Sequence, residues 1–155
     1  MAIKKPLVIT AGQIEQLQSG DNIDLGNVVT RTNANAGAMV VGEIVYASNA
    51  TSVNKAQADA QPTVRVMGLV VTGGAAAASV DIKTEGIVTL TTGEWDAVFN
   101  TTGGLTPGAT YFLSEGTAGE GTETAPTVAG DFVVRVGHAL SDTELEIDIQ
   151  QPIKL

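Results

Sequence analysis

Three acidic residues near the end of the chain form its most regular set of groups that could do chemistry. Glu144, Glu146 and Asp148 alternate with Leu145 and Ile147, so the carboxylates would share one face of a strand. Such a row could supply a glycosidase acid and base or bind a divalent cation. Neighbouring carboxylates on that face lie only about 7 Å apart along the strand, and alternation with apolar residues is typical of a solvated face. We therefore interpret the row as the solvent side of a strand.

A single histidine and two serines are the remaining candidates for acid, base or nucleophile. One histidine cannot build a cluster of imidazole ligands within one chain, although three copies could meet at a trimer axis. Its place in the sequence predicts that His138 packs on the same strand face as Phe132 and Val134, with a hydrogen bond. Neither Ser114 nor Ser141 has a nucleophile signature around it.

Aromatic and glycine-rich segments offer two further possibilities. An exposed Trp95 and Tyr111 could line a sugar-binding face, but the chain has so few large side chains that we expect both in the core. The glycines at 73–74 and 116–121 lack the Lys-Ser or Lys-Thr pair of a phosphate-binding loop. The sequence thus predicts a protein that is not an enzyme and holds no cofactor or metal.

Charge and composition narrow the range of partners. The 155 residues contain 17 acidic and 8 basic residues, a net charge of -9, which disfavours binding to nucleic acid. The region 84–134 has no lysine or arginine. Without cysteine the chain can form neither disulfides nor thiolate metal sites. No transmembrane or secretory segment is recognisable, so we expect no membrane partner and synthesis in a cytoplasm.

Three blocks of sequence occur twice. Residues 42–48, 64–68 and 80–82 recur as 108–114, 134–137 and 147–149, at offsets of 66, 70 and 67 residues. Two copies of one supersecondary unit usually pack together and share a core. The repeat predicts a tandem pair of related β units.

Periodicity and turn residues place the remaining elements around this repeat. We expect an extended arm over residues 1–9, a short helix over 11–18, a helical turn over 93–99, and polar loops over 48–62 and 115–130, the second loop exposed and mobile. Strands are predicted near 28–31, 43–47, 64–71, 79–84, 87–90, 111–113, 132–140 and 144–149. The fold class is all-β, a small sandwich or barrel-like domain over 26–155, preceded by the arm and short helix of 1–25.

One segment resembles a family of proteins. Residues 94–114 run from a Trp-Asp turn through Gly-Gly-Leu-Thr-Pro-Gly into Tyr-Phe-Leu-Ser, and this run is similar to a segment of tailed-bacteriophage virion proteins. Residues 133–141 and 149–153 look like its continuation, and residues 6–17 look like openings of phage head and tail proteins. Because tail fibres are far longer than this chain, the resemblance favours a capsid decoration, or cement, protein.

The resemblance implies a structural role on the particle. We expect the protein to bind the outer surface of the assembled capsid and to clamp neighbouring major capsid subunits, after synthesis in the bacterial cytoplasm. Its partners would be the major capsid protein and itself, as a homotrimer. The N-terminal arm would make the contact by β-augmentation, through Lys4, Lys5, Pro6, Leu7, Val8 and Ile9. The alternatives are a tail fibre or baseplate adaptor and a carbohydrate-binding virion module.

Overall fold

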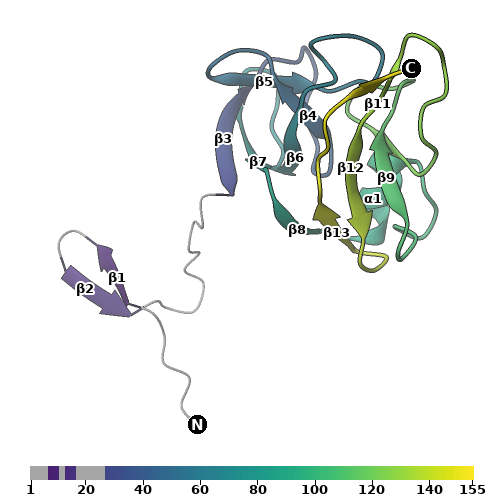
Figure 1. Cartoon of the computed structure of the whole chain (residues 1–155). Helices are drawn as coiled ribbons and strands as arrows, with labels where there is room; N and C mark the ends of the chain where they lie inside the picture. The colour runs from purple at the N-terminus through teal and green to yellow at the C-terminus, as the bar shows by residue number, and fades with distance from the viewer. Residues whose placement is uncertain (1–6, 11–12, 17–26) are drawn as a thin grey trace.

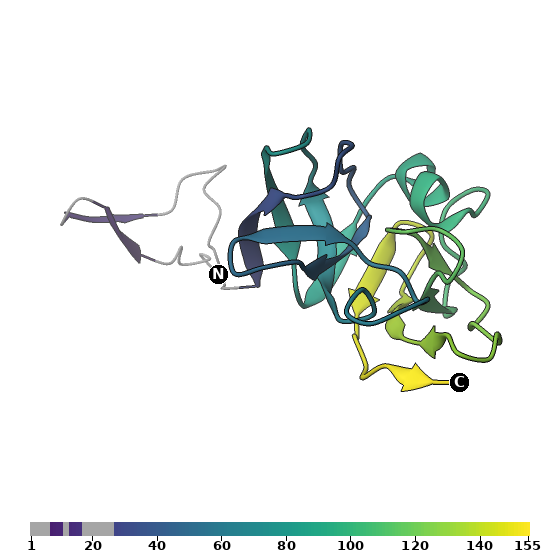
Figure 2. The same cartoon turned by 90° about the horizontal axis from the view of Figure 1, so that it is seen from above.

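The computed structural model describes residues 7–10, 13–16 and 27–155. Nearly all of its regular structure is β, with one short helix, so the predicted all-β class is confirmed. Residues 27–155 contain a closed barrel and an open sheet that lie side by side (Figures 1 and 2).

The first unit is a closed barrel of five strands. These are β3 (Val28–Asn33), β4 (Ile44–Ala47), β5 (Ser52–Lys55), β6 (Val66–Thr72) and β7 (Ser79–Lys83), in the order β3-β5-β4-β6-β7. A short parallel pairing of β3 with β5 closes the barrel, whereas the other pairs are antiparallel. One methionine and five β-branched side chains fill the interior: Met39, Val45, Val53, Val70, Val80 and Ile82.

The second unit is an open sheet of five strands. These are β8 (Gly86–Thr89), β9 (Thr110–Leu113), β10 (Gly121–Thr122), β12 (Arg135–Ala139) and β13 (Glu144–Ile147), in the order β10-β9-β12-β13-β8. Beside it, β11 (Phe132–Val133) pairs with β14 (Ile153–Lys154) near the C-terminus. The helix α1 (Thr92–Phe99) joins β8 to β9.

The two units are copies of one five-stranded arrangement. Strands β3, β4, β5, β6 and β7 correspond in order to β8, β9, β10, β12 and β13, with the same neighbours except at the closing pair. Both copies also have the same irregularity: the register of β4 and β6 shifts between Val45 and Tyr46, and that of β9 and β12 shifts between Arg135 and Gly137. A bulge at one place in both copies is a designed feature of a sheet rather than a defect. The predicted tandem repeat is confirmed.

The strand registers correct two of the three predicted offsets. Val70 pairs with Ile82 as Ala139 pairs with Leu145, so Ile82 corresponds to Leu145 at an offset of 63 residues. The offset of 67 read from the third sequence block was wrong. The offset of 70 read from the second block was wrong by one, because Gly68 corresponds to Gly137. The repeat also includes two strand pairs that the sequence did not reveal, β3 with β8 and β5 with β10.

Both predicted polar loops contain a strand. Strand β5 lies within 48–62 and β10 within 115–130. The second segment is tied to the barrel through Gly119, whose N–H donates to the Ala56 carbonyl at 2.7 Å and whose carbonyl accepts from the Ile44 N–H at 2.9 Å. Gly119 has a φ of 86°, a conformation that favours glycine. The expectation of an exposed loop over 115–130 was therefore wrong around Gly119.

The helix α1 takes the place, in the second unit, of the end of β3 that closes the barrel in the first unit. Thr30 and Thr89 occupy equivalent places opposite Asp81 and Glu144, yet two residues further on the chain enters a capping box at Thr91. The Thr91 N–H donates to the Glu94 carboxylate at 2.8 Å, and the Glu94 N–H donates to the Thr91 hydroxyl. Both bonds satisfy donors at the helix start. The bond from the Thr91 N–H, together with one from the Thr91 hydroxyl, lowers the pKa of the Glu94 carboxyl. The capping box thus starts a helix in place of a strand.

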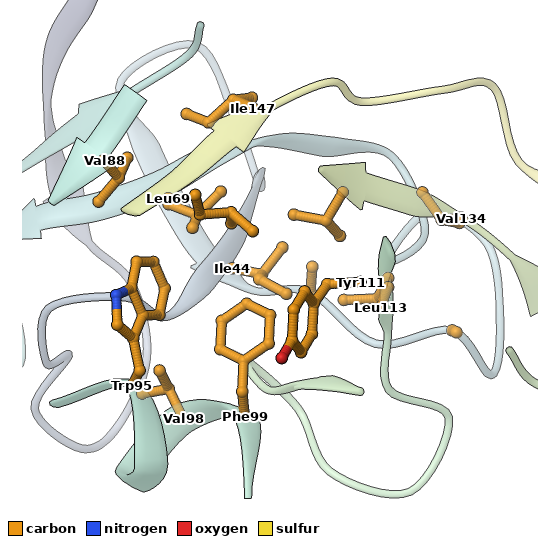
Figure 3. Close-up of a cluster of buried hydrophobic side chains, with 14 of the residues drawn as sticks. Ile44, Leu69, Val88, Trp95, Val98, Phe99, Tyr111, Leu113, Val134 and Ile147 are labelled. Atoms are coloured by element: carbon orange, nitrogen blue, oxygen red, sulfur yellow. The ribbon is translucent and has the colours of Figure 1, made fainter. Parts of the chain in front are cut away.

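The helix contributes the large side chains of the shared core. As predicted for the helical turn, Trp95, Val98 and Phe99 face inward. Phe99 stacks edge-to-face between Trp95 and Tyr111, with ring centroids 5.2 and 5.0 Å apart (Figure 3). A Cβ on Gly121 would lie 2.1 Å from the Phe99 ring, so glycine makes room for this aromatic column.

The barrel packs an apolar part of its outer face against the open sheet, and the two units share one core there. Ile44 and Leu69 point out of the barrel into the cluster that also holds Trp95 and Tyr111. By strand register, the equivalent of Leu69 on the open sheet is His138, which is half-buried. At this position the outer face of the barrel is apolar and is covered by the second unit, whereas the outer face of the open sheet is polar and is not covered by the barrel.

Two predicted elements differ from the structure. The segment predicted as one strand over 132–140 is split into β11 and β12, and the bulge at Val136 turns His138 and Leu140 away from the side of Phe132. The helix predicted over 11–18 is wrong at Gln13–Gln16, which form strand β2 paired with β1 (Leu7–Thr10). Residues 11–12 and 17–18 lie outside the described residues.

Equivalent glycines should be intolerant of a side chain in both units. A Cβ on Gly68 or Gly137 would lie 2.2 Å from the Lys83 or Glu146 carbonyl oxygen, respectively. We expect Gly137→Ala to lower the free energy of unfolding by about 1–3 kcal/mol through overpacking. The control Gly93→Ala, at a helix position where a Cβ meets nothing within 4 Å, should raise it by about 0.5–1 kcal/mol. Urea denaturation measures both changes, and equal stability of the two variants would contradict this packing.

The turn after α1 should make stability depend on acidic pH. Hydrogen bonds from the Gly104 N–H and the Thr101 hydroxyl, both 2.8 Å long, hold the pKa of Asp96 below its ordinary 3.8. A depressed folded pKa stabilises the fold above pH 3.8, and this contribution is lost as the pH falls through the folded pKa. Asp96→Asn should therefore be less stable than the wild type at neutral pH, with a difference that shrinks in acid.

Thermal unfolding from neutral to acidic pH measures this difference. The exposed Asp142→Asn is the control, because its side chain makes no hydrogen bond to the residues that the structure describes. A stability difference between the wild type and Asp96→Asn that stays constant into acid would contradict the role of the Asp96 carboxylate.

Candidate functional site

The carboxylate row lies on the outer face of the open sheet, as the sequence predicted. Glu146 is 3.3 Å from the His138 Nε2, and Asp148 is 3.2 Å from the Arg135 guanidinium. All four side chains are partly exposed. No group of three metal-ligating side chains comes together in the described ranges. These contacts are cross-strand pairs on a solvated surface, which stabilise a sheet only modestly.

The two aromatic residues considered for sugar binding lie in the core. Trp95 and Tyr111 are both 0 % exposed, and their polar ends are satisfied internally. The Trp95 indole N–H donates to the Thr143 carbonyl at 2.9 Å, and the Tyr111 hydroxyl donates to the Glu123 carboxylate at 2.6 Å. Burial raises the pKa of Tyr111, and hydrogen bonds from Thr106 and Tyr111 lower that of Glu123. The hypothesis of a sugar-binding face built on these two rings is therefore wrong, and the expectation that both lie in the core is confirmed.

The predicted contact residues of the N-terminal arm divide into two groups. Residues 7–9 belong to strand β1, whose backbone is extended as predicted and pairs with β2 in a sheet of its own. Residues 4–6 lie outside the described residues. Because β2 occupies one edge of β1, β-augmentation of a partner would use the other edge of β1 or the outer edge of β2.

A polar groove lies beside strand β10, and the sequence did not indicate it. Its volume is about 470 Å³; one bank is formed by residues between 99 and 106, at and after the end of α1, and the other by residues between 114 and 124. Glu120 and Glu123 are among the lining residues, and neither lysine nor arginine lines the groove. The only sequence signal was the absence of basic residues over 84–134.

The C-terminal edge carries exposed apolar side chains. Val128, Ile153 and Leu155 are 53, 64 and 44 % exposed. Backbone hydrogen bonds of Leu155 with Gly130 and Asp131 join this segment to β11. The edge is a second unpartnered surface in the described part of the chain, of apolar character, whereas the groove beside β10 is acidic.

Comparison with known proteins gives no assignment. No protein-family model matches the chain, and no curated protein matches it. Within 7–10, 13–16 and 27–155, no helix is long and apolar enough to cross a membrane.

Proposed function

We propose that this protein is a structural, non-enzymatic component of a tailed-bacteriophage particle. It binds the outer surface of the assembled capsid and clamps neighbouring major capsid subunits, with the N-terminal hairpin β1–β2 as the contact. The hairpin is the observation that carries the proposal. It forms a two-stranded sheet of four-residue strands that pair with each other, and such a hairpin is at best marginally stable in water without a further partner.

Sequence and fold supply further support. The run that resembles phage virion proteins spans α1, the turn after it and β9, so the resemblance covers one continuous part of the second unit. The strand β1 contains the apolar residues Leu7, Val8 and Ile9, which suit addition to a sheet edge of a partner. The rigid double β unit would hold that contact segment at the capsid surface.

Mass action explains why such binding would stabilise a capsid. A ligand that binds only the assembled lattice favours assembly by about 2.7 kcal/mol per site when its concentration is 100 times its Kd. A protein present at many lattice sites multiplies this effect, and no catalysis is required. A homotrimer at three-fold positions would fit the closed symmetry of such a shell.

Removal of the contact segment should abolish capsid binding without unfolding the body. We expect protein lacking residues 1–9 to leave the capsid fraction when purified capsids are sedimented. The full chain should cosediment with capsids and raise their temperature of disassembly. Far-UV circular dichroism of the truncated protein checks that the β units remain folded.

Two controls distinguish loss of the contact segment from a general change of the surface, and capsid binding from tail binding. Substitutions on the exposed acidic row, such as Glu146→Gln, should leave cosedimentation unchanged. Normal occupancy of capsids by the truncated protein would contradict the role of the hairpin. Binding of the full chain to isolated tails rather than to capsids would contradict the capsid role and favour the tail adaptor.

A further inference from the structure

The groove beside β10 occupies a place that is filled in the other unit. In the barrel, β5 has β4 on one side and β3 on the other. Its counterpart β10 has β9 on one side, but β10 is an edge strand of the open sheet. The bank of residues 99–106 faces it across the groove. The comparison of the two copies therefore identifies the groove as an empty strand position.

Equivalent hydrogen bonds show that the free edge of β10 is oriented like the paired edge of β5. The Ser48 N–H donates to the Ser52 carbonyl, and the Ser114 N–H donates to the Glu120 carbonyl, both at 3.0 Å. Val53 and Gly121 follow these acceptors, and in an antiparallel ladder this pattern turns their own N–H and C=O groups away from β4 and β9.

The two outward edges have different partners. The Val53 carbonyl accepts from the Ala34 N–H of the closing segment at 2.8 Å. Gly121 is a buried residue that lines the groove, its only strand partner is β9, and outside that ladder its N–H and C=O make no hydrogen bond to the described part of the chain. An edge with unpaired backbone groups is a template for an added strand.

The edge of β10 is held rigidly. Gly119 ties the start of the β10 segment to the barrel, and Phe99 packs against Gly121 from inside. At the other end of β10, Glu123 accepts the hydrogen bond of Tyr111. A partner segment would therefore meet an ordered edge and would not have to order it, which reduces the entropic cost of binding.

Charge defines the kind of segment that fits. Glu120 and Glu123 line the groove together with hydroxyl side chains, and none of the lining residues is basic. In the barrel, Thr32 lies opposite Ser52, the counterpart of Glu120, so the residue that takes the place of Thr32 in an added strand would share a face with Glu120. A cationic side chain there would be complementary to the groove.

We propose that the groove beside β10 binds one extended segment of a partner polypeptide, which carries a basic side chain and adds to β10 as a short parallel strand. Backbone hydrogen bonds to Gly121 give affinity, and the basic side chain near Glu120 gives selectivity. This inference does not depend on the capsid role proposed above.

The closing strand of the barrel supplies the probe. A synthetic peptide with the sequence of residues 27–34 and the substitution Thr32→Lys is the segment that fills the equivalent position in the first unit, with a cation at the place opposite Glu120. Titration into the isotope-labelled full chain, followed by NMR, should give saturable shifts of the Gly121 and Thr122 amides and of residues 99–106. Absence of shifts at millimolar peptide, or shifts confined to other surfaces, would overturn the proposal.

Matched controls separate strand addition from nonspecific attraction. The same peptide methylated on the amide nitrogen that corresponds to Ala34 should bind about tenfold more weakly, because one backbone bond is lost; tenfold equals about 1.4 kcal/mol. Glu120→Lys should weaken binding by a similar factor, whereas the exposed Glu85→Lys, with the same charge change outside the groove, should not. Equal affinity of the methylated peptide, or equal loss in the two lysine variants, would contradict the proposal.

Discussion

The architecture depends on how each five-stranded unit completes its sheet. In the first unit the chain continues as a strand through Asn33 and closes the barrel on β5. In the second unit the Thr91 and Glu94 capping box starts a helix at the corresponding place. A strand would satisfy the edge of its neighbour with backbone bonds, whereas a helix satisfies its own backbone and offers side chains instead. The core of the second unit is therefore covered by the side chains of Trp95 and Phe99, and no strand pairs with the outer edge of β10.

This difference also explains how one small chain obtains a sizeable core with so few aromatic residues. The barrel interior is filled by small side chains such as Val45 and Val53. The open sheet can accept large rings because the helix brings them in from one side, and Gly121 leaves space for Phe99. The apolar outer face of the barrel, with Ile44 and Leu69, completes the same cluster. The repeated strands form the two sheets. The helix α1, which only the second unit has, adds large side chains to the core, and the outer edge of β10 stays without a strand partner.

Much of this fold could be predicted from the sequence, for identifiable reasons. Alternation of apolar residues fixed β7 and β13, and the spacing of Trp95, Val98 and Phe99 revealed the inward face of α1. Strand β5 was missed because Val53 is its only apolar residue, and β10 was missed because it has two residues and begins with glycine, which has low strand propensity. The side chain of His138 was placed on the wrong face because a bulge shifts the period of two, and a bulge leaves no trace in the alternation itself.

The functional surfaces were less predictable than the fold. An empty strand position becomes visible only when the two copies are compared strand by strand, and the sequence offset changes from one strand pair to the next. The buried Trp95 and Tyr111 remove the sugar-binding face that their residue types allowed. The two proposed contacts, the hairpin β1–β2 and the edge of β10, would both act through backbone bonds rather than through a catalytic group.

Amide hydrogen exchange tests most directly the claim that the second unit is an open copy of the first. The barrel ladder pairs Val53 with β3, whereas its counterpart Gly121 has no such neighbour. The account predicts that the Gly121 amide exchanges much faster than the Val53 amide, while the central strands β4 and β9 are protected to a similar degree. Equal protection of Gly121 and Val53 in the isolated protein would contradict the open edge.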